Sequence, residues 1–225
     1  MGSDDLHGKR KARASAELQR KIKNRAQSQR FLIVCEGTKT EPNYLQELVI
    51  SLGIRPQTVT IARNDGSSPD RVVAHALALY EEDMVGGDSF DRVFCIFDRD
   101  MHTTFEAAVQ RIRDLKESNK PKPFEAITSS PCFEYWLLLH FGFTDQPFHA
   151  VGKKSVCDKV IVQLRTKPGF RHYDKGQQGV YALLKDKTPT AIAAAKQVRQ
   201  RAQATGQKNP LTHIDTLVEA LMTLT

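Results

Sequence analysis

The sequence predicts an α/β protein with a parallel sheet, helices that flank the sheet, and a helical C-terminal part. Short, continuous apolar runs at 30–35 and 93–97 are typical of strands that are buried on both faces. Between and after them, two further short strands alternate with segments whose apolar residues have helical spacing. This β-α-β-α-β-α-β order indicates a parallel sheet, because each parallel connection needs a crossover.

Four strands and three helices are expected in the first two thirds of the chain. The strands are predicted at 30–35, 58–62, 93–97 and 124–128. The helices are predicted from apolar residues at helical spacing within 44–52, 72–80 and 105–115. Gly37 permits the tight turn between the first strand and the first helix.

The pattern changes after the fourth strand. Ser130 is suited to cap a helix and Pro131 to occupy its first turn, so we expect a buried helix up to about Phe141. Further helices are predicted at about 153–165, 177–185, 189–204 and 210–224. The chain is thus divided into a basic arm (1–28), an α/β core (29–143) and a helical C-terminal region packed on the core (144–225).

Composition limits the class of protein. No apolar run is long enough for a transmembrane helix, and the polar, basic N-terminus is not a secretory signal. The cysteines lack any CxxC spacing, so we expect reduced thiols packed as small hydrophobes, rather than disulfides or zinc, in a cytoplasmic protein. These cysteines are Cys35, Cys95, Cys132 and Cys157.

Positive charge is concentrated at the N-terminus. Residues 1–30 carry nine basic and three acidic side chains, and nine minus three gives +6 of the net charge of +7. A basic arm on a nearly neutral body predicts a polyanionic partner, most simply nucleic acid, although a solubilising tail is the alternative. The arm residues expected to contact nucleic acid are Lys9, Arg10, Lys11 and Arg13.

Acidic residues follow two of the predicted strands. Asp98 and Asp100 are two positions apart, so in an extended chain they point the same way, about 6–7 Å from each other. Glu36 follows the first strand in the same manner. Open α/β sheets bind ligands at the carboxyl ends of their strands, and neighbouring carboxylates favour a bridging cation such as Mg²⁺. The alternative for the aspartates is a polar start to a loop.

Further candidates lie outside these strand ends. Glu134 is surrounded in sequence by apolar residues, where an unpaired carboxylate is costly, so a metal or a buried basic partner must satisfy it. We favour an active-site role over a structural salt bridge. Lys39 and Arg99 are candidates for contact with phosphate, with a solvated loop lysine as the alternative for Lys39. The polar and aromatic run 171–175 is expected to close over the substrate.

These motifs resemble those of known families. A strand that ends in Glu-Gly, followed two βα units later by a strand that ends in Asp-x-Asp, resembles the Toprim domain, the Mg²⁺-binding module of topoisomerases, primases and OLD-type nucleases. The finer patterns are similar to the RloB-like family over nearly the whole chain. They lie at 3–13, 34–44, 97–100, 130–141 and 209–212.

The resemblance implies a Toprim-like Rossmannoid sheet and a Mg²⁺-dependent (or Mn²⁺-dependent) nuclease of prokaryotic anti-phage defence, of the abortive-infection kind, often with an ATPase partner. It implies that Glu36 is a metal ligand or a general acid/base and that Asp98 and Asp100 hold the ion. Glu41 matches the second glutamate of the OLD-type run and would complete a second metal site, with complementation of the helix dipole as the alternative. Glu134 joins Glu36 and the two aspartates as a catalytic candidate.

The predicted function is therefore metal-dependent hydrolysis of phosphodiester bonds in DNA or RNA, tRNA included. The first alternative is a nucleic-acid-binding module that retains the fold but needs an ATPase partner and lacks activity alone. A second alternative is a regulatory protein in which metal only stabilises the fold.

Overall fold

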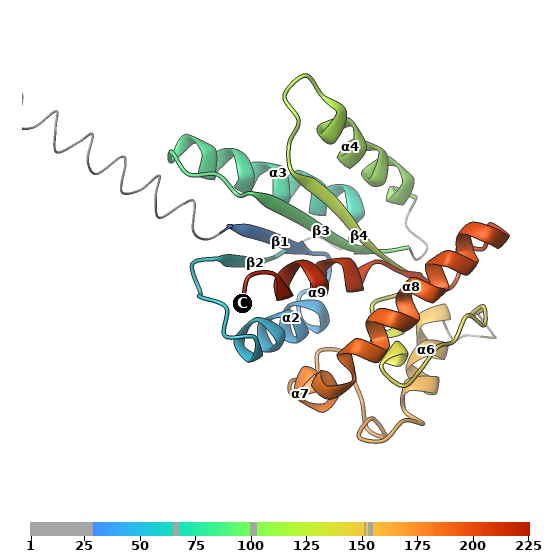
Figure 1. Cartoon of the computed structure of the whole chain (residues 1–225). Coiled ribbons are helices and arrows are strands. Elements are labelled where there is room, and N and C mark those ends of the chain that lie inside the picture. Colours follow the sequence, from blue (N-terminus) through green and yellow to red (C-terminus); the bar gives the residue numbers. More distant parts are fainter. Residues whose placement is uncertain (1–28, 65–67, 100–102, 151, 153–154) are drawn as a thin grey trace, which may run out of the picture.

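A five-stranded sheet lies at the centre of the molecule. Figure 1 shows a computed structural model of the chain, which describes residues 29–64, 68–99, 103–150, 152 and 155–225. The strand order is β2-β1-β3-β4-β5, with parallel pairing from β2 to β4 and antiparallel pairing between β4 and β5. The strands are β1 (Phe31–Cys35), β2 (Val59–Arg63), β3 (Arg92–Asp98), β4 (Phe124–Ser130) and β5 (Leu211–Thr212).

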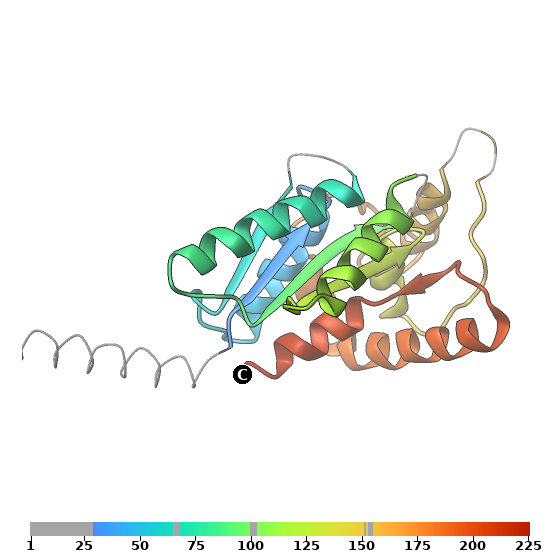
Figure 2. The same cartoon turned by 90° about the horizontal axis from the view of Figure 1, so that it is seen from above.

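Helices cover both faces of this sheet (Figures 1 and 2). One face is covered by α3 (Pro69–Val85) and α4 (Phe105–Glu117), and the other by α2 (Thr40–Ser51) and α9 (Ile214–Met222). The helical part further comprises α5 (Glu134–Leu139), α6 (Val156–Leu164), α7 (Val180–Leu184), the 3₁₀ turn η1 (Lys185–Lys187) and α8 (Thr188–Thr205). The predicted α/β class with a helical C-terminal part is confirmed. Among the described residues, no helix has the length and apolar character that crossing a bilayer requires.

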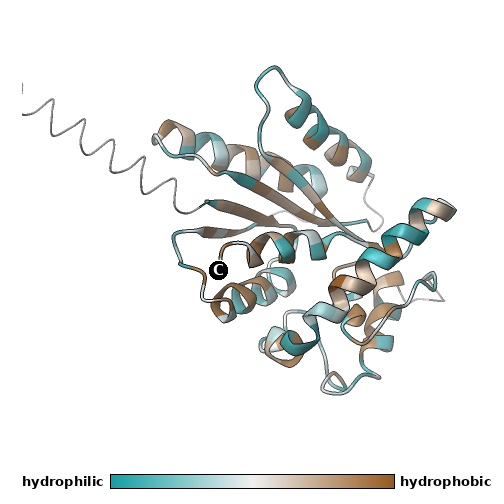
Figure 3. Cartoon of the chain, viewed as in Figure 1, coloured by the Kyte–Doolittle hydropathy of each residue, from teal (hydrophilic) through white to brown (hydrophobic). Residues whose placement is uncertain are grey.

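The central strands are buried on both faces. In β3, Phe94 and Ile96 pack with α2 and the C-terminal helices, whereas Val93, Cys95 and Phe97 pack with α3 and α4. The hydropathy colouring of Figure 3 shows the same strands as mainly apolar. Because side chains alternate along a strand, Asp98 continues the register of Phe94 and Ile96. Asp98 is therefore directed toward the face that carries α2 and the helical part.

Two elements begin later than the sequence predicts. Ser130 is the last residue of β4, where it pairs with Leu211 of β5, and the Ser130–Pro131 peptide bond is cis. The following helix therefore begins at Glu134 rather than at Pro131. The helix predicted at 210–224 likewise begins only at Ile214, because Leu211 and Thr212 form the two-residue strand β5. Such a short strand is fixed by pairing with a distant partner and leaves no periodic signal in the sequence.

The prediction of reduced thiols is wrong for two of the four cysteines. Cys132 and Cys157 form a disulfide across 25 residues of sequence, with their Cα atoms 5.8 Å apart. The fold brings them together because α5 and α6 pack against each other, which sequence spacing alone does not indicate. Cys35 and Cys95 are free and buried in the sheet, as expected.

Candidate metal centre

Two predicted carboxylates meet where β1 and β3 end. The backbone N–H of Glu36 donates to the carbonyl of Ile96 at 2.9 Å, which continues the pairing of the two strands by one residue. In turn, the backbone N–H of Asp98 donates to Oε2 of Glu36 at 3.0 Å. Both side chains are half-buried. The structure thus brings Glu36 and Asp98 together through their own backbone, at the carboxyl edge of the sheet.

Glu41 approaches the same edge from the first turn of α2. It is buried, and its carboxylate lies over the backbone of Gly37. A Cβ atom at position 37 would lie only 2.1 Å from Oε2 of Glu41, far inside contact distance. Glycine at this turn is therefore required by the close approach of the Glu41 carboxylate to the main chain.

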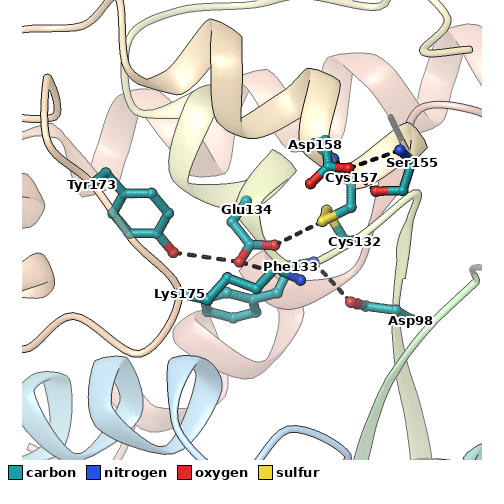
Figure 4. The surroundings of a disulfide bond; sticks show 9 residues. All are labelled: Asp98, Cys132, Phe133, Glu134, Ser155, Cys157, Asp158, Tyr173 and Lys175. Atoms are coloured by element: carbon teal, nitrogen blue, oxygen red, sulfur yellow. Dashed lines mark hydrogen bonds and ion pairs between the residues drawn. A yellow bond between two sulfur atoms is a disulfide. The ribbon is translucent and has the colours of Figure 1, made fainter. Parts of the chain in front are cut away.

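Glu134 faces these acids from the start of α5. Only 1% of the residue is exposed, and its Oε1 accepts from the hydroxyl of Tyr173 at 3.4 Å. The Nζ of Lys175 lies 3.8 Å from the same oxygen (Figure 4). The other oxygen, Oε2, lies 3.3 Å from Sγ of Cys157. Each oxygen of this buried carboxylate therefore has its own neighbours.

The start of α5 also holds the aspartate of β3. The backbone N–H of Phe133, the residue before Glu134, donates to Oδ2 of Asp98 at 3.2 Å (Figure 4). Asp98 is therefore hydrogen-bonded to the backbone of the residue that directly precedes Glu134, which fixes the two carboxylates relative to each other.

The loop before α7 completes this side of the site. Its residue Gly176 donates its backbone N–H to Oγ1 of Thr40 at 2.9 Å and accepts from Nδ2 of Asn43 at 2.9 Å. A Cβ atom at Gly176 would lie 2.8 Å from Cβ of Lys39, so the loop lies directly on the start of α2. This contact places Tyr173 and Lys175 beside Glu134. The sequence predicted that the run 171–175 closes over the substrate, but it gave no separate role to Tyr173 or Lys175.

The acidic residues act on one another electrostatically. Burial raises the pKa of Glu41 to about 7, with the charges of Glu134 and Glu36 adding to the rise and Lys175 opposing it. Burial and the charges of Glu41, Glu134 and Glu36 raise the pKa of Asp98 well above its ordinary value. Burial also raises the pKa of Glu134, against the opposing charge of Lys175. Four acids this close do not all ionise near neutral pH unless a cation offsets their charge.

The oxygen donors fit a hard divalent cation. Carboxylates are the usual protein ligands of Mg²⁺ and Mn²⁺, and the ion would offset the repulsion described above. Within the described part of the chain, however, the one group of three candidate ligands with atoms within 4.8 Å of one another is Cys132, Glu134 and Cys157. No three of the four carboxylates meet that criterion. Mg²⁺ keeps several waters and takes only one or two carboxylates directly.

Other predicted site residues lie elsewhere. Arg99 follows Asp98 but lies against α4, where its Nη2 contacts Oε1 of Glu106 at 2.7 Å and its guanidinium lies 5.2 Å from the Phe105 ring centre. Lys39 is exposed at the start of α2. The remaining predicted residues fall outside the described part of the chain: Asp100, Lys9, Arg10, Lys11 and Arg13.

His140 is a core residue. It is buried, with Nδ1 3.1 Å from the carbonyl of Trp136 and Nε2 3.5 Å from the hydroxyl of Tyr44. Burial lowers the pKa of His140 to about 4, so the ring is neutral at physiological pH. A neutral ring that donates from Nδ1 accepts at Nε2, and both nitrogens therefore have partners within the core.

Comparison with known families identifies the chain. A family model described as RloB-like protein matches residues 31–221. The chain belongs to the RloB-like family. The RloB-like match runs from β1 into α9, so all four carboxylates and Lys175 lie inside it. No curated protein and no solved structure matched the chain.

Proposed function

We propose that this RloB-like chain is a divalent-metal-dependent nuclease that hydrolyses phosphodiester bonds in DNA or RNA. The observation that carries the proposal is the gathering of four carboxylates beside one lysine at the carboxyl edge of the sheet. Clustered carboxylates, once ionised, repel a polyanion unless a cation lies between them, so they favour metal-assisted chemistry over simple binding. The four carboxylates are those of Glu36, Glu41, Asp98 and Glu134, and the lysine is Lys175.

Three of the carboxylates would hold the ion, and they differ in access to solvent. Glu36 and Asp98 are half-buried, whereas Glu41 is buried behind Gly37. Mg²⁺ or Mn²⁺ at this place would supply charge neutralisation at the phosphate and a more acidic water. Of the three, Glu36 has a fixed position at the end of β1, because its Oε2 accepts from the Asp98 backbone and its Oε1 is buried. We assign to Glu36 the acceptance of the proton from the attacking water.

Lys175 supplies the positive charge that the carboxylates lack. Its side chain is 55% exposed, yet Nζ lies 3.8 Å from the buried Glu134. An ammonium group held at the rim of an acidic site is suited to stabilise negative charge that develops on phosphate oxygens. Glu134 is then a positioning residue, because its Oε1 holds Nζ of Lys175 and also accepts from Tyr173.

The biological setting extends this proposal. In line with the resemblance to defence-associated proteins, the nuclease would act against phage, with an ATPase partner. The basic residues of the arm would bring nucleic acid to the body of the protein through their charge, which makes binding salt-dependent.

The experiment is cleavage by the pure, full-length protein. DNA, tRNA and other RNA are incubated with Mg²⁺, with Mn²⁺ or with EDTA, alone and with any ATPase encoded beside the gene. We expect cleavage that requires the metal and that Asp98→Asn abolishes. If wild type and Asp98→Asn give the same products on every substrate, the proposed function is wrong. A chain without residues 1–28 should bind nucleic acid more weakly but retain the chemistry.

A further inference from the structure

A chemically different group of ligands lies beside the acidic site. Cys132, Glu134 and Cys157 each present one ligand atom, and these three atoms all lie within 4.8 Å of one another. In the structure the two sulfurs are joined as a disulfide (Figure 4). We propose that, when this disulfide is reduced, the three residues bind Zn²⁺, and that the disulfide is the metal-free form of the same site.

The donor atoms suit zinc in type and in spacing. Two thiolates and a carboxylate are common zinc ligands, with Zn–S distances of about 2.3 Å and Zn–O distances of about 2.0–2.2 Å. In a tetrahedron of that size, sulfur and oxygen ligands lie about 3.6 Å apart. Sγ of Cys157 already lies 3.3 Å from Oε2 of Glu134. Reduction allows the sulfurs to separate to the spacing of two ligands, while Oε2 keeps its place.

The local fold presents these ligands from two fixed helix ends. Cys157 is in the first turn of α6, where Ser155 and Asp158 form a capping box with bonds of 2.8 and 3.1 Å. A cysteine in the first turn of a helix is more readily a thiolate. Cys132 lies two residues before Glu134 and is only 2% exposed. Cys132 and Glu134, which is 1% exposed, are therefore held out of water by packing that does not depend on the metal.

The charges also balance. Two thiolates, one carboxylate and Zn²⁺ leave one negative charge, and Lys175 lies 3.8 Å from Oε1 of Glu134 to offset it. Glu134 can serve both neighbours, because Oε2 faces the sulfurs and Oε1 faces Lys175 and Tyr173. With three protein ligands, the fourth zinc position is left for water, as in open zinc sites.

Formation of the site is a two-electron step followed by metal binding. An external dithiol reduces the protein disulfide, gives up two electrons and two protons, and becomes a cyclic disulfide itself. Zn²⁺ then binds as the two protein thiols release their protons. A small-molecule disulfide that accepts two electrons from the two thiolates, and is itself reduced to thiols, reverses the sequence and releases the ion. Neither step uses the phosphodiester chemistry proposed above. The two sites share Glu134 and Lys175, but the absorption band tests the zinc site whether or not the protein is a nuclease.

Cobalt substitution tests the site directly. The full-length protein is reduced, freed of reductant without air and titrated with Co²⁺, which gives an intense thiolate-to-cobalt absorption band in the near ultraviolet. We expect the band in the reduced protein, its loss on addition of one equivalent of Zn²⁺, and no band in the oxidised protein. Circular dichroism of both forms checks that reduction preserves the fold.

Variants then assign the ligands. Cys132→Ser and Cys157→Ser should each remove the band, whereas Cys95→Ala, which removes a buried thiol of the sheet, should retain it. Glu134→Gln should keep thiolate absorption but weaken Co²⁺ binding, because a neutral amide oxygen is a poorer ligand than a carboxylate. The proposal is overturned if the reduced, folded wild type shows no band, or if the band survives in the double variant Cys132→Ser/Cys157→Ser. Asp98→Asn should lose nuclease activity and keep the band, which separates the zinc site from the acidic site.

Discussion

The backbone N–H of Phe133 donates to the Oδ2 atom of Asp98 at 3.2 Å, and this bond joins the two halves of the site. Asp98 comes from the end of β3, and Phe133 immediately precedes Glu134 at the start of α5. The bond aligns a carboxylate of the sheet with a carboxylate of the helical part. A shift of α5 relative to the sheet would therefore change the charge distribution of the site as well as its shape.

Replacement of Asp98 by asparagine should separate activity from stability. Asp98→Asn removes one charge from a crowded acidic group, so we expect the metal-free protein to become more stable while cleavage falls by about 100-fold or more. Thermal melts in EDTA and cleavage assays measure the two effects. The control is Asp114→Asn, an exposed carboxylate on α4, which should change neither. A less stable Asp98→Asn protein would contradict the electrostatic account.

Gly37→Ala should damage the site more than the fold. The added methyl group would lie 2.1 Å from the Glu41 carboxylate, which is the end of a flexible side chain and can move away. We therefore expect cleavage and Mg²⁺-induced stabilisation to be lost with little change in the free energy of unfolding. Ser51→Ala, at an exposed position at the end of α2, is the control. Equal activity of Gly37→Ala and wild type would show that the position of Glu41 is unimportant.

Lys175→Met should impair cleavage without unfolding the protein. The charge of Lys175 lowers the pKa of both Glu134 and Glu41, so its removal should raise both pKa values further. The ammonium group that we assign to phosphate would also be lost. A slower cleavage rate at saturating substrate is the expected result. Lys116→Met, on the exposed side of α4, should behave as wild type, and a Lys175→Met protein as active as this control would exclude the assigned role.

Stability of the metal-free protein should fall as pH rises through neutrality. Glu41, with its pKa raised to about 7, and Asp98, raised in the same direction, bind protons more tightly in the folded chain than in the unfolded one. Their contribution is therefore full below the unfolded pKa values of 4.5 and 3.8 and is lost as pH rises through the folded pKa. His140, lowered from 6.5 to about 4, destabilises the fold only below its unfolded pKa of 6.5. We expect melting temperatures in EDTA to decrease from about pH 6.5 to 8, and Mg²⁺ to abolish most of that decrease. A melting temperature that rises over this range would contradict the assignment.

Two ion pairs between α8 and α9 should differ sharply in strength. Nη2 of Arg199 donates to Oδ2 of Asp215 at 2.6 Å, a second bond joins Nη1 to Oδ1, and Asp215 is fully buried. Asp215→Ala should destabilise the protein by about 3–5 kcal/mol, because it strands a partly buried guanidinium. Lys196 and Glu219 join the same helices at the surface, so Glu219→Ala should cost at most about 1 kcal/mol. Denaturant titrations compare the two, and equal losses would contradict the argument from burial.

The sequence predicted the parts of the fold that depend on local pattern. The apolar runs of β1 and β3, and the acids that follow them, are visible because a buried strand is continuous in sequence. The contact of Glu134 with Lys175 is not visible, because 41 positions separate them and only the packing of the loop on α2 joins them. The Cys132–Cys157 disulfide and the pairing of β5 with β4 were not predicted for the same reason, because each joins segments that are far apart in the sequence. Contacts between distant segments, rather than local preferences, complete the site.

The location of a bound metal ion tests the central claim most directly. Crystals of the full-length protein soaked in Mn²⁺ would be measured for anomalous scattering at the manganese absorption edge. We predict a peak bounded by the carboxylates of Glu36, Glu41 and Asp98, and its absence in Asp98→Asn crystals. Manganese bound only away from these three side chains, or no ordered manganese in the wild type, would contradict the account.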